Sequence, residues 1–220
     1  MAPTSPWCLV SAADYEAYMG PEGVAEAAPL AAIFGKAYAA RRPYRLAVAG
    51  AGTGGGLEHV DPRLTRRTVA LDVNLSFLAV ARQRHMRLGS SLELLCADAE
   101  KADLGEGQFE LVHAALVLER AEVQAAVPRM ASWLSPGGAL AVVLHLPGGP
   151  PAPESPHESV RALRAATRLV PPAELRRLAA EAGLAERRAY VVPLPTGRRL
   201  FAALYEKPAP RPEEAWRVFS

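Results

Sequence analysis

From Arg45 onward, short apolar runs alternate with amphipathic stretches, and this alternation limits most strongly what the chain can fold into. The apolar runs predict buried strands at 46–49, 68–71, 92–96, 109–115 and 139–146. Helices are expected between them over 76–88, with Phe77, Val80 and Ala81 facing inward, and over 122–133. Continuous apolar strands separated by helices are typical of a parallel sheet covered on both faces.

The segment before this core is expected to be helical. Ser11 and Asp14 fit a capping box at the start of a first helix, and Pro21 and Gly23 end it. A second helix is expected over about 24–38 because apolar residues recur there at helical spacing. We therefore expect an N-terminal helical cap at residues 1–44.

The segment after the fifth strand closes the sheet. The composition of 135–138 predicts a turn before that strand, and the Pro- and Gly-rich stretch 147–157 predicts an irregular loop. Helices are expected at 159–169 and at 173–182, the latter ending at Gly183. Strands at 190–194 and 200–205 are too close for a crossover and predict an antiparallel hairpin. The main domain is expected at 45–206, with a tail at 207–220.

These patterns define the expected fold class, an α/β, Rossmann-like doubly wound sheet of seven strands with the last strand antiparallel, plus N-terminal capping helices. The formal net charge of +2 and the scattered arginine doublets argue against a nucleic-acid partner. No apolar run approaches the roughly 20 residues of a membrane helix, so no membrane partner is expected. The N-terminus lacks signal-peptide features, and two cysteines argue against a disulfide framework, so we expect a cytoplasmic protein.

A glycine-rich turn follows the first strand. Gly50, Gly52 and Gly55 satisfy G-x-G-x-x-G, which permits a tight turn and close approach of a ligand but is a weak motif alone. Asp72 ends the second strand at the spacing where a carboxylate can accept hydrogen bonds from ribose hydroxyls. Asp98 follows the third strand, where it can accept from an adenine amine. Together these features predict a nucleotide-like ligand.

The same residues resemble the class I S-adenosylmethionine (SAM)-dependent methyltransferase family over about residues 15–206. The resemblance rests on LAVAGAGTG at 46–54, VALD at 69–72, LLCAD at 94–98, FELV at 109–112 and LSPGGAL at 134–140. The Pro-Gly-Gly segment and the closing hairpin distinguish this family from NAD-binding Rossmann domains. The resemblance implies that SAM is the cofactor.

The resemblance also implies where SAM would bind. Its methionine end would lie along the glycine turn, its ribose at the end of the second strand and its adenine at the end of the third. The residues expected to contact the cofactor are Gly50, Ala51, Gly52, Gly54, Asp72, Val73, Asp98, Ala99 and Ala114.

One position departs from the family. The acidic residue that helps to bind the SAM ammonium group is replaced by Val48, and Glu58 is a candidate to supply the missing charge.

Few residues are needed for the chemistry, because proximity and orientation supply most of the acceleration of methyl transfer. His113 and His145, on the fourth and fifth strands, are the candidate catalytic bases, and neutral core histidines are the alternative. Tyr15 and Tyr18, together with Met19, either form a lid over the sulfonium or pack against the domain. No metal is expected, because no histidine has a partner at metal-ligand spacing.

The sequence therefore predicts a SAM-dependent methyltransferase with a small-molecule acceptor. One alternative is a catalytically inactive, methyltransferase-like binding or scaffold protein, which Val48 favours. The other is an NAD-dependent oxidoreductase, which leaves Asp98 and the closing hairpin without a role. The oligomeric state stays open, with a homodimer as one option.

Overall fold

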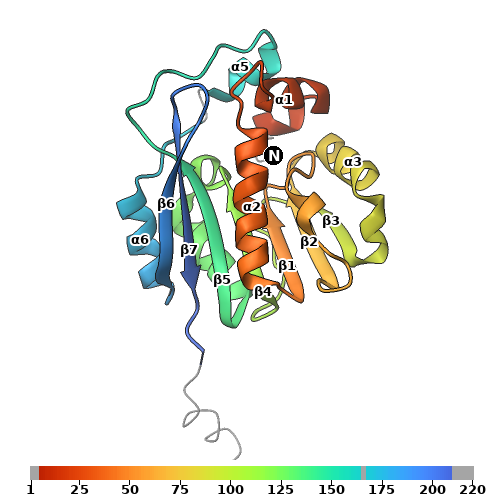
Figure 1. Cartoon of the computed structure of the whole chain (residues 1–220), viewed down its shortest axis with the longest axis vertical. Helices are drawn as coiled ribbons and strands as arrows, with labels where there is room; N and C mark the ends of the chain where they lie inside the picture. Colours follow the sequence, from red (N-terminus) through yellow and green to blue (C-terminus); the bar gives the residue numbers. More distant parts are fainter. Residues whose placement is uncertain (1–4, 165–166, 210–220) are drawn as a thin grey trace, which may run out of the picture.

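Seven strands form a single sheet in the computed structural model, which describes residues 5–164 and 167–209 (Figure 1). Their spatial order is β3-β2-β1-β4-β5-β7-β6; β1 to β5 pair in parallel, and β7 is antiparallel to both of its neighbours. This confirms the expected Rossmann-like sheet and its closing hairpin. The strands are β1 (Arg45–Ala49), β2 (Arg67–Asp72), β3 (Leu92–Cys96), β4 (Phe109–Ala115), β5 (Leu134–His145), β6 (Ala185–Pro193) and β7 (Arg199–Glu206).

Helices cover both faces of the sheet, as its continuous apolar strands require. On one face α2 packs Phe34 and Tyr38 against Leu46 and Val48 of β1, and on the other α4 and α6 join a larger apolar core. Figure 1 shows α2 in front of the sheet, with α1 and α5 beyond one end of the strands. The α-helices are α1 (Ala12–Met19), α2 (Ala27–Arg41), α3 (Leu75–Arg84), α4 (Val123–Trp133), α5 (Glu158–Arg164) and α6 (Pro172–Glu181). The 3-10 helices are η1 (Pro6–Leu9), η2 (Leu57–His59), η3 (Met86–Ser91) and η4 (Leu118–Arg120).

The helical cap forms, with both ends of its second helix displaced. Ser11 Oγ accepts a hydrogen bond from the backbone N–H of Asp14 at 3.0 Å, as expected for an N-cap. The second helix, expected over 24–38, begins at Ala27, because Ala25 takes a left-handed conformation with φ of 54°. It continues to Arg41 and ends where Arg42 also turns left-handed. The expected start and the expected end were therefore each wrong by three residues.

Two further expectations are corrected by the structure. In α3 the buried residues are Phe77, Leu78 and Ala81, so Leu78 takes the inward position that was expected for Val80. The segment 135–138 is an irregularity within β5 rather than a turn before it, and the register against β4 shifts there. Lys207 holds this irregular segment by backbone hydrogen bonds with Gly137 and Gly138, which explains why the chain stays in the sheet.

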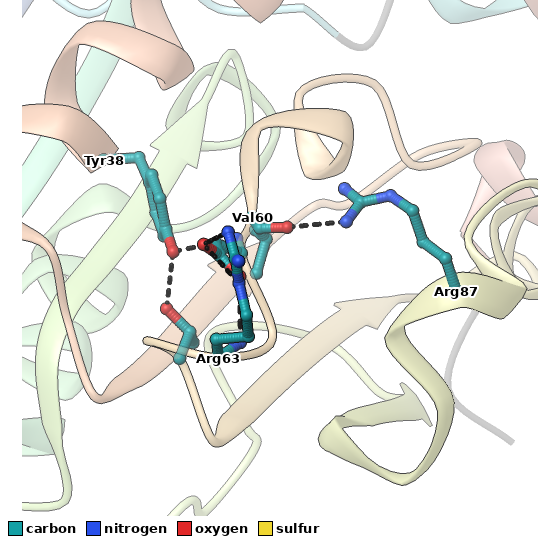
Figure 2. Close-up of polar contacts among 6 residues, drawn as sticks. Tyr38, Val60, Arg63 and Arg87 are labelled. Atoms are coloured by element: carbon teal, nitrogen blue, oxygen red, sulfur yellow. Dashed lines mark hydrogen bonds and ion pairs between the residues drawn. The ribbon is translucent and has the colours of Figure 1, made fainter.

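The segment that links the glycine turn to β2 is pinned from two sides (Figure 2). From α2, the Tyr38 hydroxyl accepts the backbone N–H of Asp61 at 3.0 Å and lies 2.8 Å from Thr65 Oγ1. From η3, Arg87 donates to the carbonyl of Val60 at 2.8 Å. Hydrogen bonds from α2 and η3 therefore hold in place the segment that follows the glycine turn.

No helix among the described residues is long and apolar enough to cross a membrane. The expected domain boundaries at 44 and 206 stay predictions. Most of the expected tail, residues 210–220, lies outside the described part of the chain.

Candidate functional site

A cavity of about 450 Å³ lies at the carboxyl ends of the central strands, where ligands bind in open α/β sheets. Its floor is formed by the glycine turn and by the ends of β1, β2, β4 and β5. Its roof is formed by η1, α1 and the start of α2, and includes Tyr15, Tyr18 and Met19. In Figure 1 these capping elements lie beyond the ends of the strands. The N-terminal segment thus encloses the space above the sheet.

The glycine turn takes a conformation that only glycine adopts without strain. Gly52 has a φ of 54°, and a Cβ atom there would lie 2.9 Å from Oη of Tyr15. The N–H of Gly52 donates to Asp72 Oδ2 at 2.9 Å, and the N–H of Ala51 donates to the carbonyl of Leu71 at 2.9 Å. These bonds join the turn after β1 to the end of β2.

Asp72 is the acidic group at the centre of the cavity floor. Its Oδ1 accepts the backbone N–H of Asn74 at 2.9 Å. Burial raises the pKa of Asp72, and the backbone N–H groups of Asn74, Gly52 and Val73 oppose that shift. The Asn74 side chain donates to the carbonyls of Trp7 and Val10, so the roof is attached directly to the residue that supports Asp72.

The structure brings together six of the nine expected cofactor contacts. The cavity is lined by Gly50, Ala51, Gly52, Asp72, Val73 and Ala99.

The other three lie apart from the cavity lining. At Gly54 an added Cβ atom would meet the His85 ring at 2.9 Å, so this glycine serves the packing of α3. Asp98 lies 3.3 Å from Nζ of Lys101 in an ion pair and accepts the N–H of Glu100. Ala114 is fully buried in the core, and its neighbour Ala115 lines the cavity instead.

Glu58 does not replace the acidic residue missing at Val48. Its carboxylate accepts the backbone N–H of Gly56 at 2.8 Å, and it lies outside the lining of the cavity. Val48 itself lines the cavity, and its neighbour on β4 in the sheet register is His113. The polar side chain beside Val48 is therefore an imidazole.

His113 is a neutral, buried histidine at the cavity wall. Its Nε2 has no hydrogen-bond partner among the described residues, and Phe34 packs edge-on against it with ring centroids 4.9 Å apart. Burial lowers the pKa of His113 to about 4. At neutral pH the ring is therefore uncharged and can accept a proton or a hydrogen bond.

His145 is held in the opposite state by two carboxylates. Its Nδ1 lies 2.7 Å from Glu119 Oε2, and its Nε2 lies 3.0 Å from Glu26 Oε1. Burial lowers the pKa of His145, but the two hydrogen-bonded carboxylates outweigh it and raise the pKa to about 9. His145 is thus an imidazolium at neutral pH, and both of its ring nitrogens are hydrogen-bonded to carboxylates. It is therefore a poor general base.

Several cavity residues were not expected from the sequence. Glu26 and Arg198 lie 172 positions apart and meet at 2.5 Å, so no local pattern could reveal the pair. Arg120 extends from η4 over the ring of Trp7. Its position shortly after β4 was the only sequence signal for it. Among residues 5–164 and 167–209, no three His, Cys, Asp or Glu side chains gather where they could hold a metal ion.

The sequence matches a known family over the part of the chain that builds this floor. Residues 47–138 match the family model described as a methyltransferase domain. This part of the chain is therefore similar to a methyltransferase domain. No curated protein sequence matches this chain.

Solved structures share the fold of this chain. The N-methyltransferase NodS of Bradyrhizobium japonicum, in complex with S-adenosyl-L-homocysteine, has a TM-score of 0.65 at 18% identity, covering 94% of each chain. The 1,6-didemethyltoxoflavin-N1-methyltransferase of Burkholderia thailandensis, with bound 1,6-didemethyltoxoflavin and S-adenosylhomocysteine, has a TM-score of 0.64 at 19% identity, covering 94% of this chain and 92% of that one. The [4+2]-cyclase SpnF has a TM-score of 0.62 at 17% identity, covering 76% of each chain. At these identities the likeness establishes the fold.

Proposed function

We propose that this chain is a SAM-dependent methyltransferase that acts on a small-molecule acceptor. The observation that carries the proposal is the bond between Asp72 and the glycine turn. The Asp72 carboxylate, at the end of β2, accepts a hydrogen bond from the N–H of Gly52 and also lines the cavity floor. A carboxylate in this place can accept from the two hydroxyls of a ribose.

The described residues fit SAM along the whole floor. Gly50, Gly52 and Gly55 place no side chain between the turn's backbone and a ligand, so a cofactor can approach it closely. Ala97 and Ala99 at the end of β3 leave room for an adenine, and Phe77 supplies an aromatic wall. When bound, SAM supplies an activated methyl group on its sulfonium.

The chain's own contribution to methyl transfer is to hold and enclose the reactants. The capping elements exclude water from the cavity, and Tyr15 offers an aromatic face on which a cation can rest. His113 lines the cavity as an uncharged imidazole and stays our candidate general base, although a pKa of about 4 makes it a weak one. His145 instead fixes the end of β5 through Glu119 and Glu26.

The size and closure of the cavity favour a small acceptor. The roof of η1, α1 and the start of α2 lies above a space of about 450 Å³, which leaves little room for a polymer chain. The formal net charge of +2 offers no strong attraction to nucleic acid. Cys8 and Cys96 are both exposed free thiols, which supports our proposal that the protein works in the cytoplasm.

An inactive scaffold is the second candidate, and Val48 favours it, since the position that would hold the SAM ammonium group carries no charge. The preserved Asp72 contact argues against it, because a domain without cofactor gains little from a buried carboxylate there.

The proposal is tested by following the methyl group. The purified protein is incubated with methyl-tritiated SAM and a cell extract, which is then separated into small-molecule, protein and nucleic-acid fractions. We expect label in the small-molecule fraction, reduced when the protein carries Asp72→Asn. Label in the protein or nucleic-acid fraction alone would contradict a small acceptor. Binding of SAM without labelling of any fraction would favour the scaffold.

A further inference from the structure

Arg120 places a positive charge in the cavity without an ion-pair partner among the described residues. It follows β4 in η4, and its guanidinium carbon lies 4.0 Å from the centroid of the Trp7 ring. Its Nη1 is shut off from solvent and has no hydrogen-bond partner among the described residues. No ion pair reaches the side chain in the part of the chain that the structure describes.

The acidic groups nearest to the cavity bind residues other than Arg120. Both oxygens of Glu119 bind His145, through the backbone N–H at 2.5 Å and the ring at 2.7 Å. Glu26 binds His145 and Arg198 through Oε1.

The other two carboxylates of the lining are engaged as well. Asp72 accepts from the backbone of Gly52 and Asn74, and Glu16 pairs with Arg84 at 2.5 Å. None of the four therefore forms an ion pair with Arg120.

Arg120 is partly buried, and a cation withdrawn from water without an ion-pair partner is costly, so proteins rarely retain one without a use. Burial lowers the pKa of Arg120, and the nearby charges of Glu119 and Glu26 oppose that shift only in part. Contact with Trp7 also holds the guanidinium in place. A planar guanidinium held at a cavity wall matches the two oxygens of a carboxylate.

We propose that Arg120 binds a carboxylate of a ligand in this cavity. Two ligands can bring that group: the amino-acid end of SAM, or a methyl acceptor that is itself a carboxylic acid. The first source rests on the proposed function, whereas the second can be tested without it. In both cases the charge of Arg120 sets the chemical class of the group that the site accepts.

The experiment compares ligands that differ in the carboxylate alone or in the part of the molecule that carries it. Wild-type protein, Arg120→Met and Arg177→Met are titrated by calorimetry with S-adenosylhomocysteine, and with methylthioadenosine, which lacks the amino-acid end. The same proteins are then titrated with benzoate and with uncharged benzamide, whose ring suits the aromatic roof. Arg177 is exposed and paired with Glu181 on α6, so its variant removes an equal charge outside the cavity.

We expect Arg120→Met to lose about 10- to 100-fold in affinity for one carboxylate ligand while Arg177→Met keeps it, because hydrogen bonds to charged groups contribute about that much. Loss for S-adenosylhomocysteine with methylthioadenosine unchanged assigns the carboxylate to the cofactor. Loss for benzoate with benzamide unchanged assigns it to the acceptor. An Arg120→Met protein that binds all four ligands as the wild type does would overturn the inference. If wild-type protein binds neither adenosine ligand, the result counts against the proposed function, and the comparison of benzoate with benzamide still tests Arg120.

If Arg120→Met does not fold, Arg120→Lys replaces it, because lysine lacks the planar fork of the guanidinium.

Discussion

The protonated state of His145 predicts that stability depends on pH in the alkaline range. Its pKa is about 9 in the folded protein, against about 6.5 in an unfolded chain. At about 1.4 kcal/mol for each tenfold change in proton affinity, the difference corresponds to about 3 kcal/mol of unfolding free energy. The source of this energy is the pair of carboxylates, Glu119 and Glu26, on the two ring nitrogens.

The sign follows from the direction of the pKa shift. Because the folded pKa lies above the unfolded one, the full stabilisation is present below about pH 6.5. It is lost as the pH rises toward 9, where the folded protein also releases the proton. Wild-type protein should therefore become less stable between pH 6 and pH 10.

The assay is urea unfolding at intervals of one pH unit, on wild-type protein and on His145→Asn. Groups other than His145 titrate in both proteins, so the difference between the two profiles isolates the histidine. We expect that difference to shrink by about 3 kcal/mol from pH 6 to pH 10. Two parallel profiles would refute the assignment of a raised pKa to His145.

Three further predictions concern the floor and wall of the cavity. Gly52→Ala should lower the unfolding free energy by about 1–2 kcal/mol in urea, because alanine is strained at a left-handed position and its Cβ meets Tyr15; unchanged stability would contradict this. Asp72→Asn should weaken S-adenosylhomocysteine binding by about tenfold or more in calorimetry, with circular dichroism unchanged, and equal affinity would exclude Asp72 from the ribose site. Wild-type protein should lose stability as the pH falls from about 6.5 through 4, because His113 is neutral when folded; His113→Val should lose less, and the same acid profile in both would count against a neutral His113.

The sheet could be predicted from the sequence because its signals are local. The central strands β1 and β4 are nearly continuous apolar runs, and the short gap between β6 and β7 allows no crossover. The segment 135–138 was mispredicted because turn composition also suits an irregular strand. Its backbone is held by hydrogen bonds with Lys207, which lies about 70 positions later in the chain. The residues next to 135–138 in the sequence therefore cannot reveal this contact.

The site was predictable where residues lie next to a strand end. Asp72 and the glycine turn follow β2 and β1 directly, and the fold then brings them together. Glu26 and Arg198 belong to segments far apart in the chain, so their meeting at His145 depends on tertiary packing. The positive charge of His145 could not be predicted from the sequence either, because the carboxylates of Glu119 and Glu26 raise its pKa.

The central claim is that the cavity over Asp72 and the glycine turn holds SAM. Calorimetric titration of the purified protein with S-adenosylhomocysteine, paired with thermal unfolding, tests it most directly. We predict saturable binding in the micromolar range, with about 2.7 kcal/mol of added stability at 100 times the dissociation constant. Neither heat nor stabilisation at millimolar ligand would contradict the account and would leave the scaffold as the better description of the chain.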